Sequence, residues 1–228
     1  ERSLVRAAAR SPIVEVFNTA AALIESHARQ ASARLYAVTS AVPGEGKSTV
    51  TCNLAVALAR AGSRVLLVDA DLRKATQHQL LNVANDPGLS SYLIGATDEI
   101  DTVIFPTEVE NLSLLPSGPL LQSPAPYLRS ERFRALLPEL RERFDFLFVD
   151  LPPVRSAADG LHVVGLADAV LLVLAAGETR KDDATAAKRL VRGAQGKLAG
   201  CILNKAEIQT RGYYYYSAAP AVEAGAAE

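Results

Sequence analysis

Methionine is absent from this chain, and cysteine occurs only twice in 228 residues. Because the chain begins at Glu1 and contains no methionine, we expect it to be a piece of a longer polypeptide. The two cysteines, Cys52 and Cys201, are far apart and have no CxxC context, so the sequence predicts neither a disulfide framework nor a zinc site. Both lie in largely apolar runs, where we expect buried, inert thiols.

Long apolar runs and an excess of either charge are also lacking. The longest apolar stretch, residues 163–176, contains Asp168 and is shorter than the roughly 18 residues that cross a bilayer. We expect no signal peptide within these residues, and a membrane segment upstream of them would not be visible in this sequence. Its 24 Lys and Arg and 25 Asp and Glu give a net charge of −1, which argues against a nucleic-acid partner. With 49% hydrophobic residues, the chain is predicted to form one globular domain.

Short apolar runs alternate with longer helical patterns. Such runs are typical of strands covered on both faces, and their alternation with helices predicts an α/β fold, with a mostly parallel sheet between helices. The predicted strands are residues 34–40, 64–70, 112–117, 144–150, 169–176 and 198–204. The predicted helices are residues 12–29, with Ser11 as cap and Pro12 as first residue, and 47–62, 124–143 and 181–195. The segment NDPGLSSYLIG, residues 85–95, predicts a turn and a short helix.

The segment AVPGEGKS, residues 41–48, follows the first predicted strand and opens a helix. It matches the phosphate-binding loop pattern, with Ala41 where the strict pattern has Gly. Its glycines let successive backbone N–H groups point at phosphate oxygens, and the helix adds its positive end. A glycine-rich turn with a chance lysine is the alternative, which the flanking strand and helix disfavour. The predicted nucleotide-binding residues are Pro43, Gly44, Glu45, Gly46, Lys47, Ser48 and Thr49.

Three carboxylates stand at the ends of predicted strands: Asp69, Asp71 and Asp150. Residues two apart in a strand point to the same side, so Asp69 and Asp71 would repel each other without a cation nearby. An apolar run that ends in Asp is the usual second metal-binding element of nucleotide hydrolases. Solvated loop acids or a helix cap are the alternatives. We predict that Ser48, Asp71 and Asp150 hold Mg²⁺ and that Lys47 contacts the β- and γ-phosphates.

Two further features lie near the C-terminus. Asn204 ends the last predicted strand, where its amide either hydrogen-bonds a purine edge or belongs to a turn, and the two alternatives have similar weight. Tyr213, Tyr214, Tyr215 and Tyr216 are four of the seven tyrosines of the chain. We expect a domain over residues 1–210 and a flexible tail over residues 211–228.

The motifs AVPGEGKS, LLVDADLR and FLFVDLPP, together with the tyrosine cluster, resemble those of the bacterial tyrosine kinases, or BY-kinases. The resemblance runs from about Ser11 to Tyr216 and includes PGLSSYLIG, LPSG, SERFRALLPEL and GCILN. It implies a P-loop NTPase fold of the Min/Par type. It also implies transfer of the ATP γ-phosphoryl group, with Mg²⁺, to the tyrosine cluster of a neighbouring copy.

The resemblance also implies functional roles and partners. Lys47 and Ser48 match the first nucleotide motif of the family, Asp69 and Asp71 the second and Asp150 the third, so the predicted catalytic residues are Lys47, Asp69 and Asp71. A tyrosine hydroxyl has a pKa near 10 and needs a proton acceptor, so Asp69 is either that acceptor or the holder of a metal-bound water. The implied partners are further copies of the chain, a membrane polysaccharide co-polymerase segment, fused or separate, and a phosphotyrosine phosphatase. The implied location is the inner face of the bacterial cell membrane, and the implied role is control of exopolysaccharide or capsule export.

Three departures from the family pattern stand out. The helix motif E-x-x-R-x-x-R that supports a ring of subunits retains Glu15 but has Asn18 and Ala21 at the arginine positions, which puts ring assembly in doubt. Leu151 replaces the usual Thr after Asp150 and removes a hydroxyl near the predicted metal. The number of predicted phosphate acceptors is at the low end for the family, with four adjacent tyrosines.

Two rival functions share this fold. Min- or Par-type ATPase switches carry an extra lysine five residues before the main loop lysine, and Val42 at that position favours the kinase. The other rival function is that of a polysaccharide-export regulator, which binds ATP without phosphorylating. The three departures from the family pattern keep this alternative open. Tyr213 follows Asn204 by nine residues, or about 30 Å of extended chain, so reach alone does not exclude the chain's own site.

Overall fold

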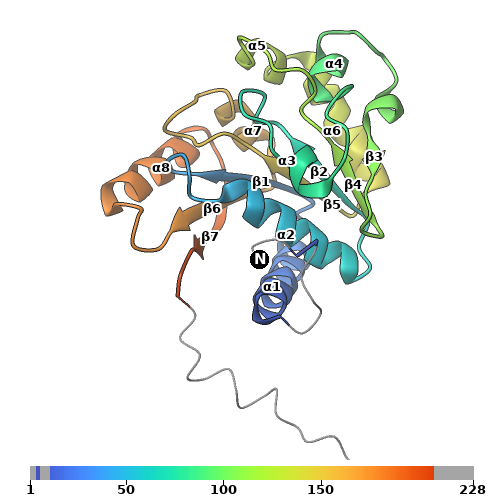
Figure 1. Ribbon diagram of the computed structural model, residues 1–228. Coiled ribbons are helices and arrows are strands. Elements are labelled where there is room, and N and C mark those ends of the chain that lie inside the picture. The colour runs from blue at the N-terminus through green and yellow to red at the C-terminus, as the bar shows by residue number, and fades with distance from the viewer. Residues whose placement is uncertain (1–3, 6–10, 208–228) are drawn as a thin grey trace, which may run out of the picture.

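A computed structural model of the protein describes residues 4–5 and 11–207. In this part a single sheet has the strand order β3-β4-β2-β5-β1-β6-β7 (Figure 1). All neighbouring strands are parallel except β3 and β4, which are antiparallel. The strands are β1 (Leu35–Ser40), β2 (Val65–Asp69), β3 (Phe105–Pro106), β4 (Leu112–Leu115), β5 (Phe146–Asp150), β6 (Ala169–Ala175) and β7 (Leu198–Asn204). The predicted α/β fold is confirmed.

Helices cover both faces of the sheet, as continuous apolar strands require. On one face α1 (Pro12–Ala31) packs over α2 (Lys47–Arg60), as Figure 1 shows. Both helices bury side chains in the core on this face of the sheet. On the other face lie α6 (Glu131–Arg143), α7 (Leu161–Leu166) and α8 (Lys181–Gly193). Each strand sends alternate side chains into the two cores. In β1, Tyr36 belongs to the α1–α2 core and Leu35 to the other.

The predicted helix boundaries are correct for α1, α2 and α8 within a few residues. Pro12 is the first residue of α1, but the side chain of Ser11 makes no capping hydrogen bond. The predicted helix over residues 124–143 is in fact two helices, α5 (Ala125–Leu128) and α6, and the prediction was wrong there. The break occurs at Ser130, whose Oγ accepts a hydrogen bond from the backbone N–H of Phe133 and so caps a new helix.

The remaining elements are short. The turn and short helix predicted over residues 85–95 are present as α4 (Leu89–Leu93). The sequence did not predict α3 (Gln77–Leu81), α7, β3 or the 3₁₀ helix η1 (Ile100–Val103), which are each too short to show a periodic pattern. In the described part of the chain, no helix is long and apolar enough to cross a membrane.

The strand β7 corrects one expectation about the cysteines. It is an edge strand whose side chains at positions 199, 201 and 203 are exposed. Cys201 is therefore exposed, whereas Cys52 on α2 is buried as expected. The sequence predicts that the apolar run over residues 198–204 is a strand covered on both faces. This strand instead lies at the edge of the sheet, where α8 does not cover the side that carries Cys201.

The topology brings the predicted functional segments to one edge of the sheet. In a parallel sheet all carboxyl ends point the same way, and ligands bind there. β2 and β5 end in register, since Asp69 pairs with Asp150. The loop after β1, the Asp residues that end β2 and β5, and Asn204 at the end of β7 therefore meet at this edge.

Candidate active site

The loop between β1 and α2 has the backbone conformation that a phosphate cradle needs. Gly44 and Gly46 have φ values of 88° and 84°, which other residues rarely adopt. α2 begins at Lys47, so the positive end of its dipole faces the loop. Pro43 and Gly44 are exposed at the turn, while Ser48 and Thr49 are half-buried in the first turn of α2.

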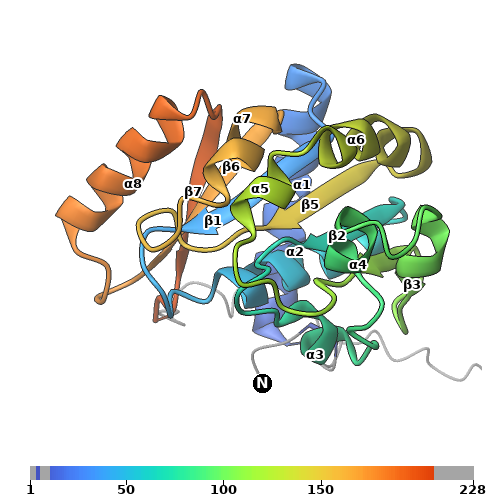
Figure 2. The same ribbon diagram turned by 90° about the horizontal axis from the view of Figure 1, so that it is seen from above.

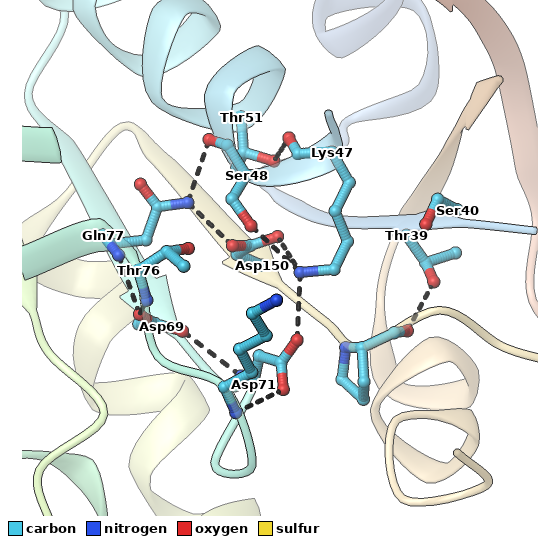
Figure 3. A network of polar contacts seen from close by, with 12 residues as sticks. Thr39, Ser40, Lys47, Ser48, Thr51, Asp69, Asp71, Thr76, Gln77 and Asp150 are labelled. Atoms are coloured by element: carbon cyan, nitrogen blue, oxygen red, sulfur yellow. Dashed lines mark hydrogen bonds and ion pairs between the residues drawn. The ribbon is translucent and has the colours of Figure 1, made fainter. Parts of the chain in front are cut away.

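The Lys47 ammonium lies among three of the oxygen-bearing residues that the sequence singled out (Figure 3). Its Nζ is 3.1 Å from Asp71 Oδ2, 3.2 Å from Asp150 Oδ1 and 3.0 Å from Ser48 Oγ. The side chains of Lys47, Asp71 and Asp150 are 10%, 7% and 0% exposed. Burial lowers the pKa of Lys47, but the charges of Asp150 and Asp71 outweigh it, and the net direction is upward. The ammonium stays charged as the counter-ion of both carboxylates.

These oxygens also fit a hard divalent cation. Mg²⁺ prefers carboxylate and hydroxyl oxygens, and it keeps several waters or phosphate oxygens in its shell. Ser48, Asp71 and Asp150 provide such a donor set, and the ammonium of Lys47 holds a positive charge among them. No three His, Cys, Asp or Glu side chains form a metal cluster within the described residues.

Asp69 is held differently from the other two acids. It is fully buried, and both of its oxygens accept backbone N–H groups. Asp71 N donates to Oδ1 at 3.3 Å, while Thr76 N and Gln77 N donate to Oδ2 at 3.0 Å each. Burial and then the nearby charge of Asp150 raise the pKa of Asp69 to about 7. Its visible contacts thus anchor the loop that carries Asp71, and its role as proton acceptor stays a prediction.

Gln77 is a site residue that the sequence analysis missed. It is the first residue of α3 and is fully buried. Its Nε2 donates to Asp150 Oδ2 at 2.7 Å and to the backbone oxygen of Ser48 at 3.0 Å (Figure 3). One amide therefore orients the acid at the end of β5 and ties it to α2. No motif or spacing in the sequence marks this glutamine.

A second network of hydrogen bonds, centred on Glu45, supports the phosphate loop. The buried Glu45 carboxylate accepts hydrogen bonds from Val42 N, at 2.9 Å, and from the Thr179 hydroxyl. The Glu45 side chain thus fixes the loop to the turn after β6. The backbone N–H of Glu45 remains available for a phosphate. Thr179 was also missed by the sequence analysis.

Asn204 completes this network from β7. Its Nδ2 donates to the Glu45 backbone oxygen at 2.9 Å. A Cβ on Gly46 would collide with the Asn204 amide, so Gly46 is needed for close approach as well as for its φ value. In this structure the amide faces the loop. Contact with a purine edge stays a prediction.

The three departures from the BY-kinase pattern have different surroundings. Glu15 and Asn18 are exposed on α1, whereas Ala21 is buried beside α2, where it helps line a groove. Leu151 is buried in the core beside α6 and α7, so its side chain contributes to packing. The acceptor residues Tyr213 to Tyr216 lie outside the described residues.

Comparisons with known proteins decide the family. A family model described as an AAA domain matches residues 33–181. The putative tyrosine-protein kinase CapB of Staphylococcus aureus is 36% identical over 179 residues, which are 78% of this chain and 78% of CapB. The tyrosine-protein kinase YwqD of Bacillus subtilis (strain 168) is 37% identical over 179 residues, 78% of this chain and 75% of YwqD. The chain belongs to the family of bacterial tyrosine-protein kinases.

Solved structures agree with this assignment. The chimerical protein CapA2B2 aligns with a TM-score of 0.81 and 35% identity, over 89% of this chain and 88% of that chain. The septum site-determining protein MinD from Pyrococcus horikoshii, solved with Mg-ADP, aligns with a TM-score of 0.60 and 25% identity, over 75% and 69%. The predicted P-loop fold, the resemblance to BY-kinases and the enzyme class, a bacterial-type tyrosine kinase, are confirmed.

Proposed function

We propose that this kinase transfers the γ-phosphoryl group of Mg·ATP to the tyrosines at positions 213–216, chiefly those of a neighbouring copy. The observation that carries the proposal is the position of the Lys47 ammonium, 3.1 Å from Asp71 and 3.2 Å from Asp150 beside the loop hydroxyl of Ser48. Phosphoryl transfer depends mainly on positioning and on neutralising charge, and these groups provide both.

In the proposed site the loop N–H groups would bind the phosphates, and Ser48, Asp71 and Asp150 would hold Mg²⁺, which would supply charge neutralisation. Lys47 would contact the β- and γ-phosphates. Asp69 accepts a hydrogen bond from the backbone N–H of Asp71 and has a pKa of about 7, and it is our candidate to accept the tyrosine proton or to hold a metal-bound water.

A kinase is favoured over a Min- or Par-type switch by the surroundings of Val42. Its N–H is bonded to the Glu45 carboxylate, and its side chain packs against the core beside α6 and α7. A switch of this fold would carry a second lysine there, and this chain offers none. By the family resemblance, we propose that the kinase regulates exopolysaccharide or capsule export together with a membrane co-polymerase segment at the inner face of the cell membrane.

Incubation with Mg·ATP followed by mass spectrometry of the tail tests the proposed transfer. We expect phosphate on one or more of the tyrosines at positions 213–216, and labelling slower by on the order of 10²–10³-fold in the Lys47→Met variant. The tail variant with all four tyrosines changed to Phe should still bind ATP but incorporate no label. ATP hydrolysis that responds to membranes or DNA, without label on tyrosine, would instead indicate a switch. Nucleotide binding alone would indicate an export regulator.

A mixing experiment tests transfer between copies. Lys47→Met protein with an intact tail is combined with active protein lacking residues 211–228. Phosphate on the inactive protein's tail requires transfer between chains. If the tail becomes labelled only when it belongs to an active chain, the trans part of the proposal is wrong while the kinase assignment stands.

A further inference from the structure

A groove lies on the face of the molecule formed by α6, α7 and α8, away from α1 and α2. It has a volume of about 770 Å³ and is bounded by the end of α5, the first turn of α6, α7 and the last turns of α8. Leu166 and Leu190 contribute apolar surface, and Leu190 is 37% exposed. In Figure 2 the helices that form the groove, α5 to α8, lie along one side of the sheet, with α1 beyond its other face.

Arginines surround this groove. Arg129, Arg134 and Arg189 line it together with His162, and no acidic residue belongs to the lining. Among the described residues, Arg129 and Arg189 take part in no ion pair, and Arg134 pairs with the exposed Glu131. Elsewhere in the same part of the chain, arginines such as Arg64 and Arg141 face a carboxylate. The groove therefore concentrates unneutralised positive charge.

The surroundings of His162 are a second indication of positive charge in this groove. Arg134 donates to its Nε2 through Nε at 3.3 Å, which requires that this ring nitrogen carry no proton. Partial burial, then the charges of Arg134 and Arg129, lower the pKa of His162, and only the exposed Glu131 acts in the opposite direction. Arg134 is thus held by His162 and Glu131. The guanidinium groups of Arg129 and Arg189, which take part in no ion pair among the described residues, are the ones available to an external anion.

We propose that this groove binds a phosphotyrosine segment of a second copy of the chain, an inference that rests on the proposed autokinase function. Arginine guanidinium groups bind phosphate by paired hydrogen bonds, and clusters of arginines are a common means of recognising phosphorylated motifs. The apolar surface of Leu166 and Leu190 suits the aromatic ring behind the phosphate. The groove would hold a tyrosine that has been phosphorylated and has left the active site.

The shape of the site favours a peptide side chain over a lipid surface. A membrane presents many headgroups in a plane and is best met by a flat or protruding basic face. Here the arginines stand around a hollow with apolar walls. Such a hollow has room for a phosphorylated ring, and membrane binding becomes an outcome of the test.

Binding of a synthetic peptide tests the proposal without requiring that the kinase be active. The full chain is titrated into labelled RGYYYYSAAP, residues 211–220, carrying one phosphate on Tyr214, and fluorescence anisotropy is followed. We expect the phosphopeptide to bind at least about tenfold more tightly than the unphosphorylated peptide, and Arg189→Ala to weaken it about tenfold, since charged hydrogen bonds are lost. Arg189→Lys keeps the charge but not the paired donors and should fall between.

The matched control is Arg64→Ala, which removes the same charge from an exposed arginine outside the groove. The proposal is overturned if Arg189→Ala and Arg64→Ala bind the phosphopeptide equally, or if inorganic phosphate displaces the peptide as well as phenyl phosphate does. It is also overturned if phosphatidylserine vesicles bind through Arg189 and the phosphopeptide does not. A missing phosphate on the tail after incubation with Mg·ATP defeats the proposed function, whereas loss of Arg189-dependent peptide binding defeats only the groove.

Discussion

The active site and the groove between α6, α7 and α8 handle charge in opposite ways. At the sheet edge, Lys47, Asp71 and Asp150 are nearly inaccessible, and each charge faces an opposite charge within 3.2 Å. In the groove, Arg129 and Arg189 are exposed and take part in no ion pair among the described residues. Buried charges need partners because their desolvation is costly, whereas exposed charges do not. In the active site, one cation can replace another beside the fixed carboxylates. The groove, in contrast, can receive an anion from outside the chain.

The largest expected effect comes from removing the cation of the buried cluster. Lys47→Met leaves Asp71 and Asp150 without their counter-ion, which should lower the free energy of unfolding by about 3–5 kcal/mol. The freed oxygens should bind Mn²⁺ without nucleotide at least about tenfold more tightly than wild type does, because a positive charge a few Å away no longer repels the ion. Phosphoryl transfer should fall by on the order of 10²–10³-fold.

Chemical denaturation with and without Mn²⁺ measures the change in the free energy of unfolding, and electron paramagnetic resonance of free Mn²⁺ measures the change in Mn²⁺ affinity. The control is Lys74→Met, which removes an exposed lysine from the loop after β2. Equal Mn²⁺ affinity in wild type and Lys47→Met would show that the ammonium does not compete with a divalent cation, and the contrast with the groove would lose its basis.

Gln77→Ala removes the amide that orients Asp150 without changing any charge. The Asp150 Oδ2 atom loses a hydrogen bond of 2.7 Å in a fully buried position, which costs about 1–3 kcal/mol. For a domain of this size the melting temperature should fall by roughly 2–4 °C per kcal/mol. Gln79→Ala, at an exposed position of the same helix, is the control. An unchanged melting temperature and transfer rate for Gln77→Ala would mean that the acid keeps its place without the amide.

Asn204→Ala tests the support behind the phosphate loop and should act more weakly. Loss of one hydrogen bond to the Glu45 oxygen is worth about 1 kcal/mol, so the KM for ATP should rise about fivefold with a smaller change in kcat. Asn18→Ala, an exposed amide on α1, is the control. Kinetics with GTP separate the two roles of this residue. A loop support leaves the preference between ATP and GTP unchanged, whereas a contact with the purine edge makes the preference change.

The parts of the site that the sequence could predict are those with a local pattern. Lys47, Ser48, Asp71 and Asp150 stand in short motifs at strand ends, and a parallel sheet brings strand ends together whatever the loops do. Their proximity thus followed from the strand pattern alone. Fold class was predictable for the same reason, since continuous apolar runs between helical patterns leave few architectures.

The parts that the sequence could not predict arise where distant segments meet. Gln77 acts on Asp150 across 73 positions, and Thr179 acts on Glu45 across 134. Neither residue belongs to a motif, and α3 is only five residues long. The groove draws its arginines from the end of α5, from α6 and from α8, so its charge is invisible in a chain whose net charge is −1.

The smallest effect is expected for the stability of Arg189→Ala, and it bears directly on the comparison between the two regions. Arg189 has no carboxylate to lose and lies near two other arginines, so its removal should change the free energy of unfolding by less than about 0.5 kcal/mol. Arg141→Ala is the contrast. Its guanidinium is 3.0 Å from Asp168, and both side chains are partly buried, so its removal should cost about 1 kcal/mol. Denaturation of both variants gives the two values. A clear loss of stability in Arg189→Ala would mean that this arginine supports the fold, and the groove would then not hold its positive charge free for a ligand.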